Sequence, residues 1–386
     1  MKGRKRLNVE IVLAAVFAVA CGSATPLAAT TATPSSGEEV TSSSAVTAQA
    51  SPTGPASASP GAIVDSTFGF LIGNAVHRES DAQTVFILGI GNFAGVVSHD
   101  GRRLAYWDKA SLRVIDIAPG STPRTLMNVT ALGEYAYNIA WSSDGTGIAV
   151  GVNGGGGGAA DAPPGYTAIR LIEVTGGQPR EIARIANANV VPLAWERTAH
   201  LIAAYEPFCC GTLNYDTITE EGAVTRTKPD SDLYFFQPSH DAKFVFGRNL
   251  ASGDGPFLST TYLRVWPVGS YEAGTTIRSA KAGPIRAAEW MPGSQLIGVL
   301  FDDRLELWSP NGLSRAISLP NVPPFAAANP NASLLFRADG KAVFISVQAG
   351  TGADANTIAV EIETGTSEDV IWGGLWPQPR TSVRLS

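Results

Sequence analysis

The residues with the strongest potential for chemistry are two adjacent cysteines in the segment Glu206-Pro-Phe-Cys209-Cys210-Gly211. Apart from Cys21 they are the only cysteines of the chain, and an oxidising compartment would favour their pairing. Adjacent Cα atoms lie about 3.8 Å apart, however, which is below the roughly 4.4–6.8 Å of an ordinary disulfide. The pair is therefore either a strained vicinal disulfide, which would present Phe208 and the sulfurs as a rigid apolar knob, or two thiols.

Other groups that could do chemistry show no recognisable arrangement. The four histidines (His77, His99, His200 and His240) lack metal-ligand spacing, and we expect those beside tight turns to be exposed to solvent. The carboxylates Glu134, Glu196, Glu206 and Glu289 fall near expected strand ends, where a pair could perform acid–base chemistry; a solvated rim is the simpler interpretation. We therefore predict no catalytic residue, no metal site and no cofactor.

The first 20 residues have the pattern of a signal peptide. A basic start (Lys2, Arg4, Lys5 and Arg6) precedes an apolar run that is too short to span a membrane. The small residues directly before Cys21 resemble the lipobox of bacterial lipoproteins, with Ala18 where leucine is commonest. This resemblance implies cleavage at residue 20 and a lipid on Cys21; the alternative is an ordinary secretory signal.

Residues 21–62 consist almost entirely of Ser, Thr, Ala, Pro and Gly. Such a segment cannot bury enough apolar surface to offset its ordering entropy, so we expect a disordered tether. The whole chain carries a net charge of −6, and residues 1–20 contain four bases and one acid, so the remainder carries −9. That sign argues against nucleic acid as a partner.

The elements that must position these groups lie in residues 63–386, where a short pattern recurs at intervals of roughly 40–54 residues. A large apolar residue stands three positions before a tight turn, and a β-branched or leucine residue stands four positions after it. Its clearest copies have Asp-Gly turns at Asp100, Asp144 and Asp339. Repeats of this length with four short strands each predict an all-β, seven-bladed β-propeller, with six or eight blades as alternatives.

Each end of the repeat region supplies only part of a blade, and the two parts complete each other. Residues 374–385 supply strands without an outer pair, and residues 67–88 supply strands without an inner pair. We therefore predict six whole blades and one composite blade, with the C-terminus on the inside and the N-terminus on the outside. Such closure would satisfy the edges that an open sheet leaves exposed.

The turn motif itself, as in Ser142-Ser-Asp144-Gly145 and Ser98-His-Asp100-Gly101, resembles that of TolB-like and WD-repeat-like propellers. The third strands do not end in the Trp-Asp pair of true WD repeats. The resemblance therefore implies a fold and no particular ligand.

Long insertions between second and third strands (151–166, 206–211, 249–259 and 348–356) predict a functional face opposite the tight turns. We expect Phe208, Cys209, Cys210, Trp266 and Trp308 to form a binding face there. The favoured function is an extracytoplasmic, lipid-anchored module that binds a protein, peptide or cell-wall ligand. The alternatives are a secreted form, a structural subunit of a cell-envelope complex, and a hydrolase or lyase that uses rim carboxylates.

Overall fold

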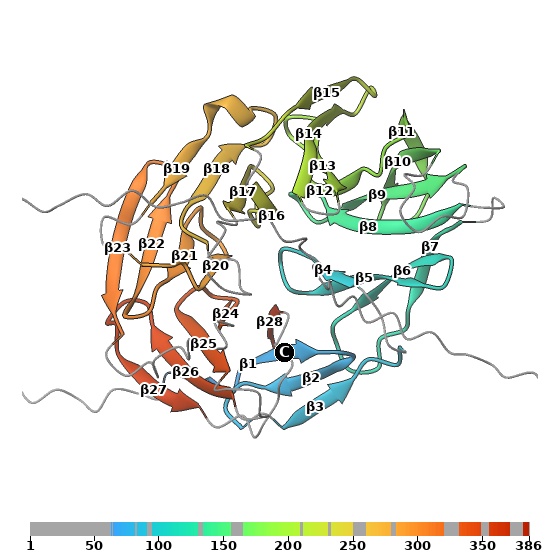
Figure 1. Cartoon of the computed structure of the whole chain (residues 1–386). Coiled ribbons are helices and arrows are strands. Elements are labelled where there is room, and N and C mark those ends of the chain that lie inside the picture. Colours follow the sequence, from blue (N-terminus) through green and yellow to red (C-terminus); the bar gives the residue numbers. More distant parts are fainter. Residues whose placement is uncertain are drawn as a thin grey trace, which may run out of the picture. The chain divides into compact units, whose positions relative to one another are not determined.

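The computed structural model describes residues 63, 65–81, 83–90, 95–129, 134–155, 165–208, 211–230, 233–249, 260–278, 283–319, 332–348, 355–370 and 381–385. The expected signal peptide, Cys21 and the linker lie outside these residues. Within them the chain forms seven four-stranded antiparallel sheets, which are the blades of a β-propeller (Figure 1). The seven-bladed all-β fold predicted from the repeat is therefore confirmed.

Six blades consist of four consecutive strands each, in the order in which they occur in the chain. Blade 1 contains β4 (Gly95–Val97), β5 (Arg103–Asp108), β6 (Ser111–Asp116) and β7 (Arg124–Asn128), and blade 2 contains β8 (Tyr135–Trp141), β9 (Gly147–Gly154), β10 (Tyr166–Glu173) and β11 (Arg180–Ala186). Blade 3 contains β12 (Val191–Glu196), β13 (Leu201–Phe208), β14 (Gly211–Thr219) and β15 (Val224–Thr227).

Blade 4 contains β16 (Leu233–Pro238), β17 (Phe244–Asn249), β18 (Leu263–Pro267) and β19 (Thr275–Ile277), with the short 3-10 helix η1 (Tyr271–Ala273) before its last strand. Blade 5 contains β20 (Ala287–Trp290), β21 (Ile297–Leu300), β22 (Arg304–Ser309) and β23 (Gly312–Ser318). Blade 6 contains β24 (Ala332–Phe336), β25 (Ala342–Gln348), β26 (Ala355–Glu361) and β27 (Ser367–Val370).

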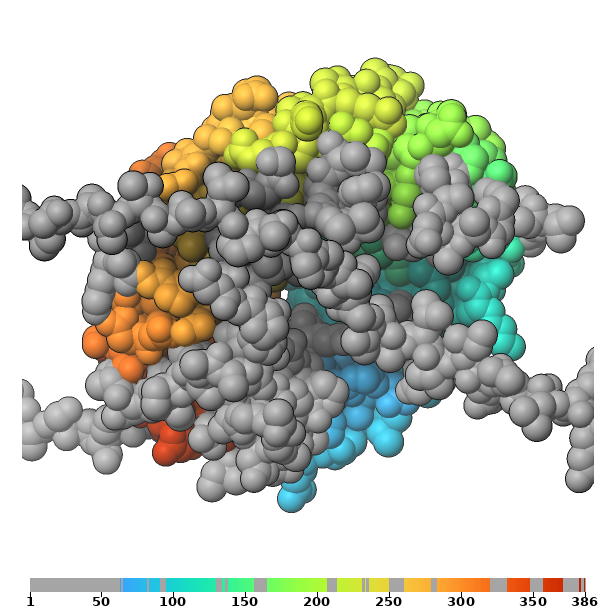
Figure 2. Space-filling model, in the orientation of Figure 1, coloured from blue at the N-terminus to red at the C-terminus, as the bar shows by residue number. Residues whose placement is uncertain are grey.

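The seventh sheet is the predicted composite blade, in which the order is β28 (Thr381–Arg384), β1 (Phe68–Ile72), β2 (Ala75–Arg78) and β3 (Thr84–Ile87). Phe68 lies opposite Arg384 and Leu71 opposite Thr381, so the C-terminal strand is the inner one. The blue atoms of the N-terminal strands and the red atoms of the C-terminal blade both lie in the lower part of Figure 2, and the pairing of β28 with β1 closes the ring. The division differs from our expectation of two strands from each end, because Ala75–Arg78 forms a third N-terminal strand.

The core lies between successive blades. The repeat column before the turns supplies Trp141, Trp195 and Trp290, each at most 2% exposed. The column after the turns supplies Leu104, Ile148, Ile202, Val245, Ile297 and Val343, which are all buried. These buried repeat positions supply much of the apolar burial between blades, and such burial is the dominant favourable term in folding.

Candidate functional site

The direction of the strands divides the connections between two faces of the ring. Since neighbouring strands are antiparallel, the turns between first and second strands share one face with the turns between third and fourth strands; we call this the turn face. The connections between second and third strands share the opposite face, which we call the loop face. The β13–β14 hairpin lies on the loop face, and the Asp turns lie on the turn face.

The turn face is built from a repeated set of hydrogen bonds. In three blades a serine hydroxyl donates to an aspartate Oδ1 two residues later, at 2.6 Å for Ser98 and Asp100, 2.6 Å for Ser142 and Asp144, and 2.7 Å for Ser239 and Asp241. The same hydroxyl accepts a backbone N–H from the start of the second strand. The fourth turn residue has a positive φ, which explains the glycines at positions 101 and 145.

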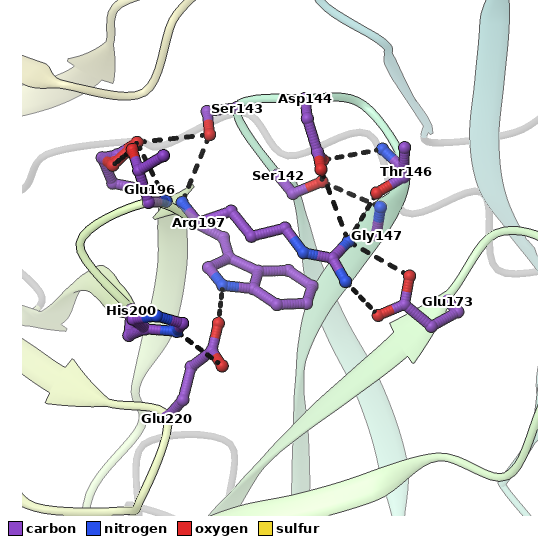
Figure 3. A network of polar contacts seen from close by, with 12 residues as sticks. Ser142, Ser143, Asp144, Thr146, Gly147, Glu173, Glu196, Arg197, His200 and Glu220 are labelled. Carbon is purple, nitrogen blue, oxygen red and sulfur yellow. Dashed lines mark hydrogen bonds and ion pairs between the residues drawn. The ribbon is translucent and has the colours of Figure 1, made fainter.

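The turn of blade 2 is also joined to the turn of blade 3 (Figure 3). Arg197 contacts Glu173 with both terminal nitrogens, and its guanidinium lies 4.9 Å from the centre of the Trp195 ring. Ser143 accepts a hydrogen bond from the backbone of Arg197 at 3.2 Å. Glu196, one of the carboxylates singled out from the sequence, accepts hydrogen bonds from the backbone of its own turn. These polar groups therefore hold two blades together.

Tryptophan side chains make a second kind of link between blades. The Nε1–H of Trp141 donates to the carbonyl oxygen of Val96 in blade 1 at 2.9 Å. The Nε1–H of Trp290 likewise donates to the carbonyl oxygen of Gln237 in blade 4 at 3.0 Å. The polar groups named on the turn face form hydrogen bonds within the protein. We therefore interpret this face as structural.

The loop face is different at blade 3, where β13 and β14 form one of the longest hairpins of the described chain. Phe208 is the last residue of β13 and lies opposite Gly211, so Cys209 and Cys210 connect the two strands. The segment 206–211, expected as a loop insertion, is therefore the tip of a hairpin. Cys209 and Cys210 lie outside the described residues, and their pairing stays a prediction.

Two carboxylates lie together beneath this tip. Glu206 is opposite Asn214 and Asp216 is opposite Ala204, which places both acidic side chains on the same face of the sheet. The side chain of Asp216 is fully buried, and that of Glu206 is 7% exposed. The Arg226 guanidinium lies 2.6 Å from Glu206 Oε1 and 3.5 Å from Asp216 Oδ1, and Asn214 donates to Glu206 Oε2 at 2.7 Å.

One cation is thus shared between two buried carboxylates. Burial, together with the neighbouring charge of Glu206, raises the pKa of Asp216 well above its ordinary value, against the attraction of Arg226. One of the two carboxyl groups therefore keeps a proton closer to neutral pH than an exposed carboxyl would. Such a pair can accept and donate protons, which is the chemistry that the sequence analysis considered for rim carboxylates.

Other polar groups on the loop face are used internally. In blade 2 the buried Asn153 donates to Asn189 at 2.9 Å and lies 2.6 Å from the hydroxyl of Thr167. Glu134 accepts a hydrogen bond from Tyr166 at 2.8 Å and pairs with Arg170 at 3.1 Å. Glu134 therefore has partners of its own and forms no carboxylate pair with the other acids considered from the sequence.

The last of those acids, Glu289, lies on β20. Its carboxylate accepts a hydrogen bond from Gln237 of blade 4 and one from its neighbouring backbone N–H. Burial raises its pKa to about 7. Of the four carboxylates, Glu206 shares an arginine with a fully buried second acid, Asp216, whereas Glu134 shares Arg170 with the more exposed Glu181.

Two residues of the expected binding face prove to lie elsewhere. Trp266 is opposite Val245 and Trp308 is opposite Ile297, so both stand at the turn-face ends of their third strands. Trp266 is fully buried among Tyr215, Phe236 and Tyr271, and Trp308 is half-buried with its Nε1–H donated to Glu306. The assignment to the loop face was wrong because a third strand runs back from that face. Phe208 is on the expected face.

Solvent exposure, expected for the histidines beside turns, holds for His200 only. His200 is exposed and lies 3.2 Å from Glu220. His99 and His240 are partly buried, and the centres of their rings lie 6.2 Å apart. The described residues contain no group of three or more His, Cys, Asp or Glu side chains suited to a metal ion. None of the helices in the described part of the chain is long and apolar enough to cross a membrane.

Comparison with models of known protein families gives no match, and comparison with curated protein sequences gives none either. Among solved structures, the chain is similar to an oligogalacturonate lyase in complex with manganese, with 14% identity, a TM-score of 0.52, and coverage of 75% of this chain and 83% of that one. It is also similar to the oligogalacturonate lyase of Vibrio parahaemolyticus, with 11% identity, a TM-score of 0.50, and coverage of 74% and 82%. A putative TolB from Agrobacterium tumefaciens matches with 13% identity, a TM-score of 0.40, and coverage of 74% and 83%.

At these identities the similarity to the two lyases shows the fold alone. Fold and blade order together define the chain as a seven-bladed β-propeller.

Proposed function

We propose that this propeller is an extracytoplasmic, lipid-anchored module that binds a protein, peptide or cell-wall ligand through the tip of the β13–β14 hairpin. The anchor would be Cys21, and residues 21–62 would be the tether. A tether of about 40 flexible residues reaches roughly 35 Å, which would hold the binding face away from the membrane. The net charge of −9 expected after cleavage disfavours nucleic acid as the ligand.

The observation that carries this proposal is the contrast between the two faces. On the turn face, the serines, aspartates and tryptophans of the repeat hydrogen-bond to one another and to neighbouring blades. On the loop face, blade 3 extends a hairpin whose second and third strands continue beyond their outer neighbour β15, from Glu206 to Asn214. Binding residues on rigid scaffolds lie mostly on such projecting connections.

A comparison of two surface variants tests the proposal. Full-length wild type, Phe208→Ala and the turn-face control Arg102→Ala would be purified from cells with their bound material after gentle solubilisation. We expect one partner protein or glycan to be retained by wild type and Arg102→Ala and to fall at least tenfold with Phe208→Ala. Equal retention by all three proteins would contradict the assignment of the binding face. A partner protein whose retention depends on a large flat surface, rather than on Phe208 alone, would instead indicate a structural subunit.

The lipid anchor needs a test of its own. Cys21→Ser should move the protein from the membrane fraction to the soluble extracytoplasmic fraction, because one modified cysteine supplies the proposed attachment. A Cys209→Ser, Cys210→Ser double variant is the matched control and should stay with the membrane. A Cys21→Ser protein that stays in the membrane fraction would rule out lipid anchoring at this residue.

A hydrolase or lyase is the second candidate, and the paired carboxylates Glu206 and Asp216 favour it. Their shared site can hold a proton near neutral pH, as acid–base catalysis requires. The two oligogalacturonate lyases of the same fold suggest acidic glycans as the first substrates to try. Glu206→Gln and Asp216→Asn should each abolish any activity found, while Glu134→Gln should retain it. Activity that survives both changes would remove this pair from the mechanism.

A further inference from the structure

The tight turn of blade 6 departs from the repeat at the position of its serine. Ser98, Ser142 and Ser239 stand two residues before the turn aspartates of blades 1, 2 and 4, whereas Arg337 has this position before Asp339. The Arg337 guanidinium donates to both carboxylate oxygens of Asp339, with Nε 2.9 Å from Oδ1 and Nη2 3.0 Å from Oδ2. Arginine therefore binds the turn aspartate as serine does in the other turns, but its side chain is long enough to reach beyond its own blade.

Arg337 also joins blade 6 to the segment that leads into β1 of the composite blade. Its Nη1 donates to the carbonyl oxygen of Ile63 at 2.7 Å and lies 3.5 Å from Oε1 of Glu79. The same Glu79 oxygen accepts the backbone N–H of Asp65 at 2.9 Å. Since the Arg337 side chain is only 9% exposed, these contacts fix Ile63 and Asp65 against the turn of blade 6.

A cavity of about 290 Å³ lies between this leading segment and blade 6. Its lining includes Asp65 and Ser66 of the leading segment and Arg337, Lys341, Ala342 and Glu361 of blade 6. Ala342 lies opposite Glu361 at the turn-face end of the β25–β26 pair, so the cavity belongs to the turn face. Its volume is just below the roughly 300–1,000 Å³ of typical small-molecule sites, which suits a small ligand.

The cavity offers a ligand one cation and one carboxylate oxygen. Lys341 is exposed, and its ammonium group forms no ion pair or hydrogen bond with the described residues. Glu361 accepts the hydroxyl of Thr364 at 2.7 Å through Oε2, and its Oε1 has no hydrogen-bond partner in the described part of the chain. Arg337, by contrast, is neutralised by its two bonds to Asp339. The groups left for a ligand are therefore of opposite charge.

The lining also limits the class of ligand. None of the described residues around the cavity is aromatic, so the cavity has no flat ring on which a sugar or a nucleobase could stack. Its two acidic and two basic side chains sum to zero charge, which favours neither a pure anion nor a pure cation. Ile63 and Ala342 are placed to contact a short hydrocarbon side chain.

We propose that this cavity binds a small zwitterion of the α-amino-acid type, whose carboxylate pairs with Lys341 and whose ammonium group pairs with Glu361. Charge-assisted hydrogen bonds of this kind are among the stronger ones in proteins. The ligand would contact both blade 6 and the segment that leads into β1, and would thereby stabilise the closed ring. The site lies on the face opposite the β13–β14 hairpin, so it is independent of the proposed ligand-binding function.

Melting of the full chain in the presence of each of the common α-amino acids tests the site. A ligand that binds only the folded chain raises its melting temperature, so we expect at least one amino acid to raise it by several degrees. Calorimetric titration with that amino acid should then give one site per chain. The absence of a rise with every amino acid would overturn the proposal.

Lys341→Gln shows whether the amino acid occupies this cavity. The variant should bind it roughly tenfold more weakly or worse, because a hydrogen bond between charged groups is lost. Lys243→Gln is the matched control and should bind as wild type does, since Lys243 is exposed and follows Asp241 of blade 4 by two residues, as Lys341 follows Asp339. Equal affinity of Lys341→Gln and wild type would overturn the assignment.

Derivatives of the bound amino acid test the two charges without any substitution in the protein. The N-acetyl derivative lacks the ammonium group, and the amide derivative lacks the carboxylate. Each should bind roughly tenfold more weakly than the amino acid itself, because each loses one charge-assisted hydrogen bond. A derivative that binds as tightly as the amino acid would contradict a site for a zwitterion.

Discussion

Single residues determine how each tight turn of the propeller is held. In blade 2 the hydroxyl of Ser142 donates to Asp144 at 2.6 Å and accepts the N–H of Gly147 at 2.8 Å. The residue is fully buried, so the hydroxyl has no solvent to replace these partners. Ser142, which the sequence identified only as part of a turn motif, therefore stabilises the turn through two buried hydrogen bonds.

Ser142→Ala should destabilise the protein by about 1–3 kcal/mol, because the backbone N–H of Gly147 would lose its buried acceptor and Asp144 would lose a donor. Urea unfolding measures the change. Ser318→Ala is the control, since Ser318 is exposed at the end of β23, and it should change the free energy of unfolding by less than about 0.5 kcal/mol. Equal effects of the two substitutions would contradict this account of the turn.

Glu79 should make stability depend on pH in an unusual direction. Burial raises its pKa from 4.5 to about 7, although the backbone of Asp65 and the charge of Arg337 favour the ionised form. Between these values the folded state binds a proton more tightly than the unfolded state, so stability should rise as pH falls from about 7 to 4.5. The gain is on the order of 3 kcal/mol. Calorimetric melting of wild type across this range measures it.

Glu79→Gln isolates this contribution, because an amide can still accept the N–H of Asp65 while Arg337 keeps its two contacts with Asp339. The variant should show a flatter dependence on pH between 4.5 and 7 than wild type. A variant whose melting temperature follows pH as steeply as that of wild type would show that Glu79 is not responsible.

Glu206 was a candidate from the sequence, whereas its partner Asp216 was not. Asp216 has no distinguishing neighbour in the sequence; only the pairing of β13 with β14 brings it to the same sheet face. Trp266 and Trp308 were assigned to the wrong face for the same reason, because strand pairing and strand direction are not visible in the sequence. Apolar alternation identifies a strand, but which end of it reaches which face depends on the number of strands before it.

At the scale of elements, close contact between blades restricts what can stand at the start of a second strand. Gly147 begins β9, and a Cβ atom built on it would lie 2.4 Å from the Trp195 ring of blade 3. The glycine was visible in the sequence as part of the turn, but the tryptophan that requires it belongs to the next repeat. Side-chain contacts between one repeat and the next therefore cannot be predicted from the pattern within a single repeat.

Gly147→Ala should destabilise the protein by about 1–3 kcal/mol, because the methyl group would push Trp195 out of its place between blades. Denaturant unfolding would quantify the loss. Gly89→Ala is the matched control: no atom lies within 4 Å of the position of its Cβ, so little change is expected. Tolerance of both substitutions would show that blades 2 and 3 can separate at no cost.

At the scale of the whole molecule, closure of the ring depends on one short strand. β28 pairs with β1 over four residues and gives the composite blade its inner strand. The number of blades followed from counting repeats, and the mixed origin of the last blade followed from its incomplete ends. The division into one C-terminal and three N-terminal strands could not be predicted from the sequence, because β2 is only four residues long and carries no repeat motif.

Removal of residues 381–386 should lower the melting temperature by 10 °C or more and promote association, because it exposes an edge of β1 to other chains. Melting and size-exclusion chromatography measure both effects. Removal of Ser386 alone is the control and should leave both unchanged. A truncated protein that melts like wild type and stays monomeric would show that β28 does not close the ring.

Cross-linking in living cells would show whether the tip of the β13–β14 hairpin is the binding surface. A photo-reactive residue would be placed at Phe208 in one protein and at Arg102 on the turn face in another, and captured material would be identified by mass spectrometry. We expect one reproducible partner to be captured from position 208 and not from position 102. Capture from position 102 alone, or equally from both positions, would contradict it.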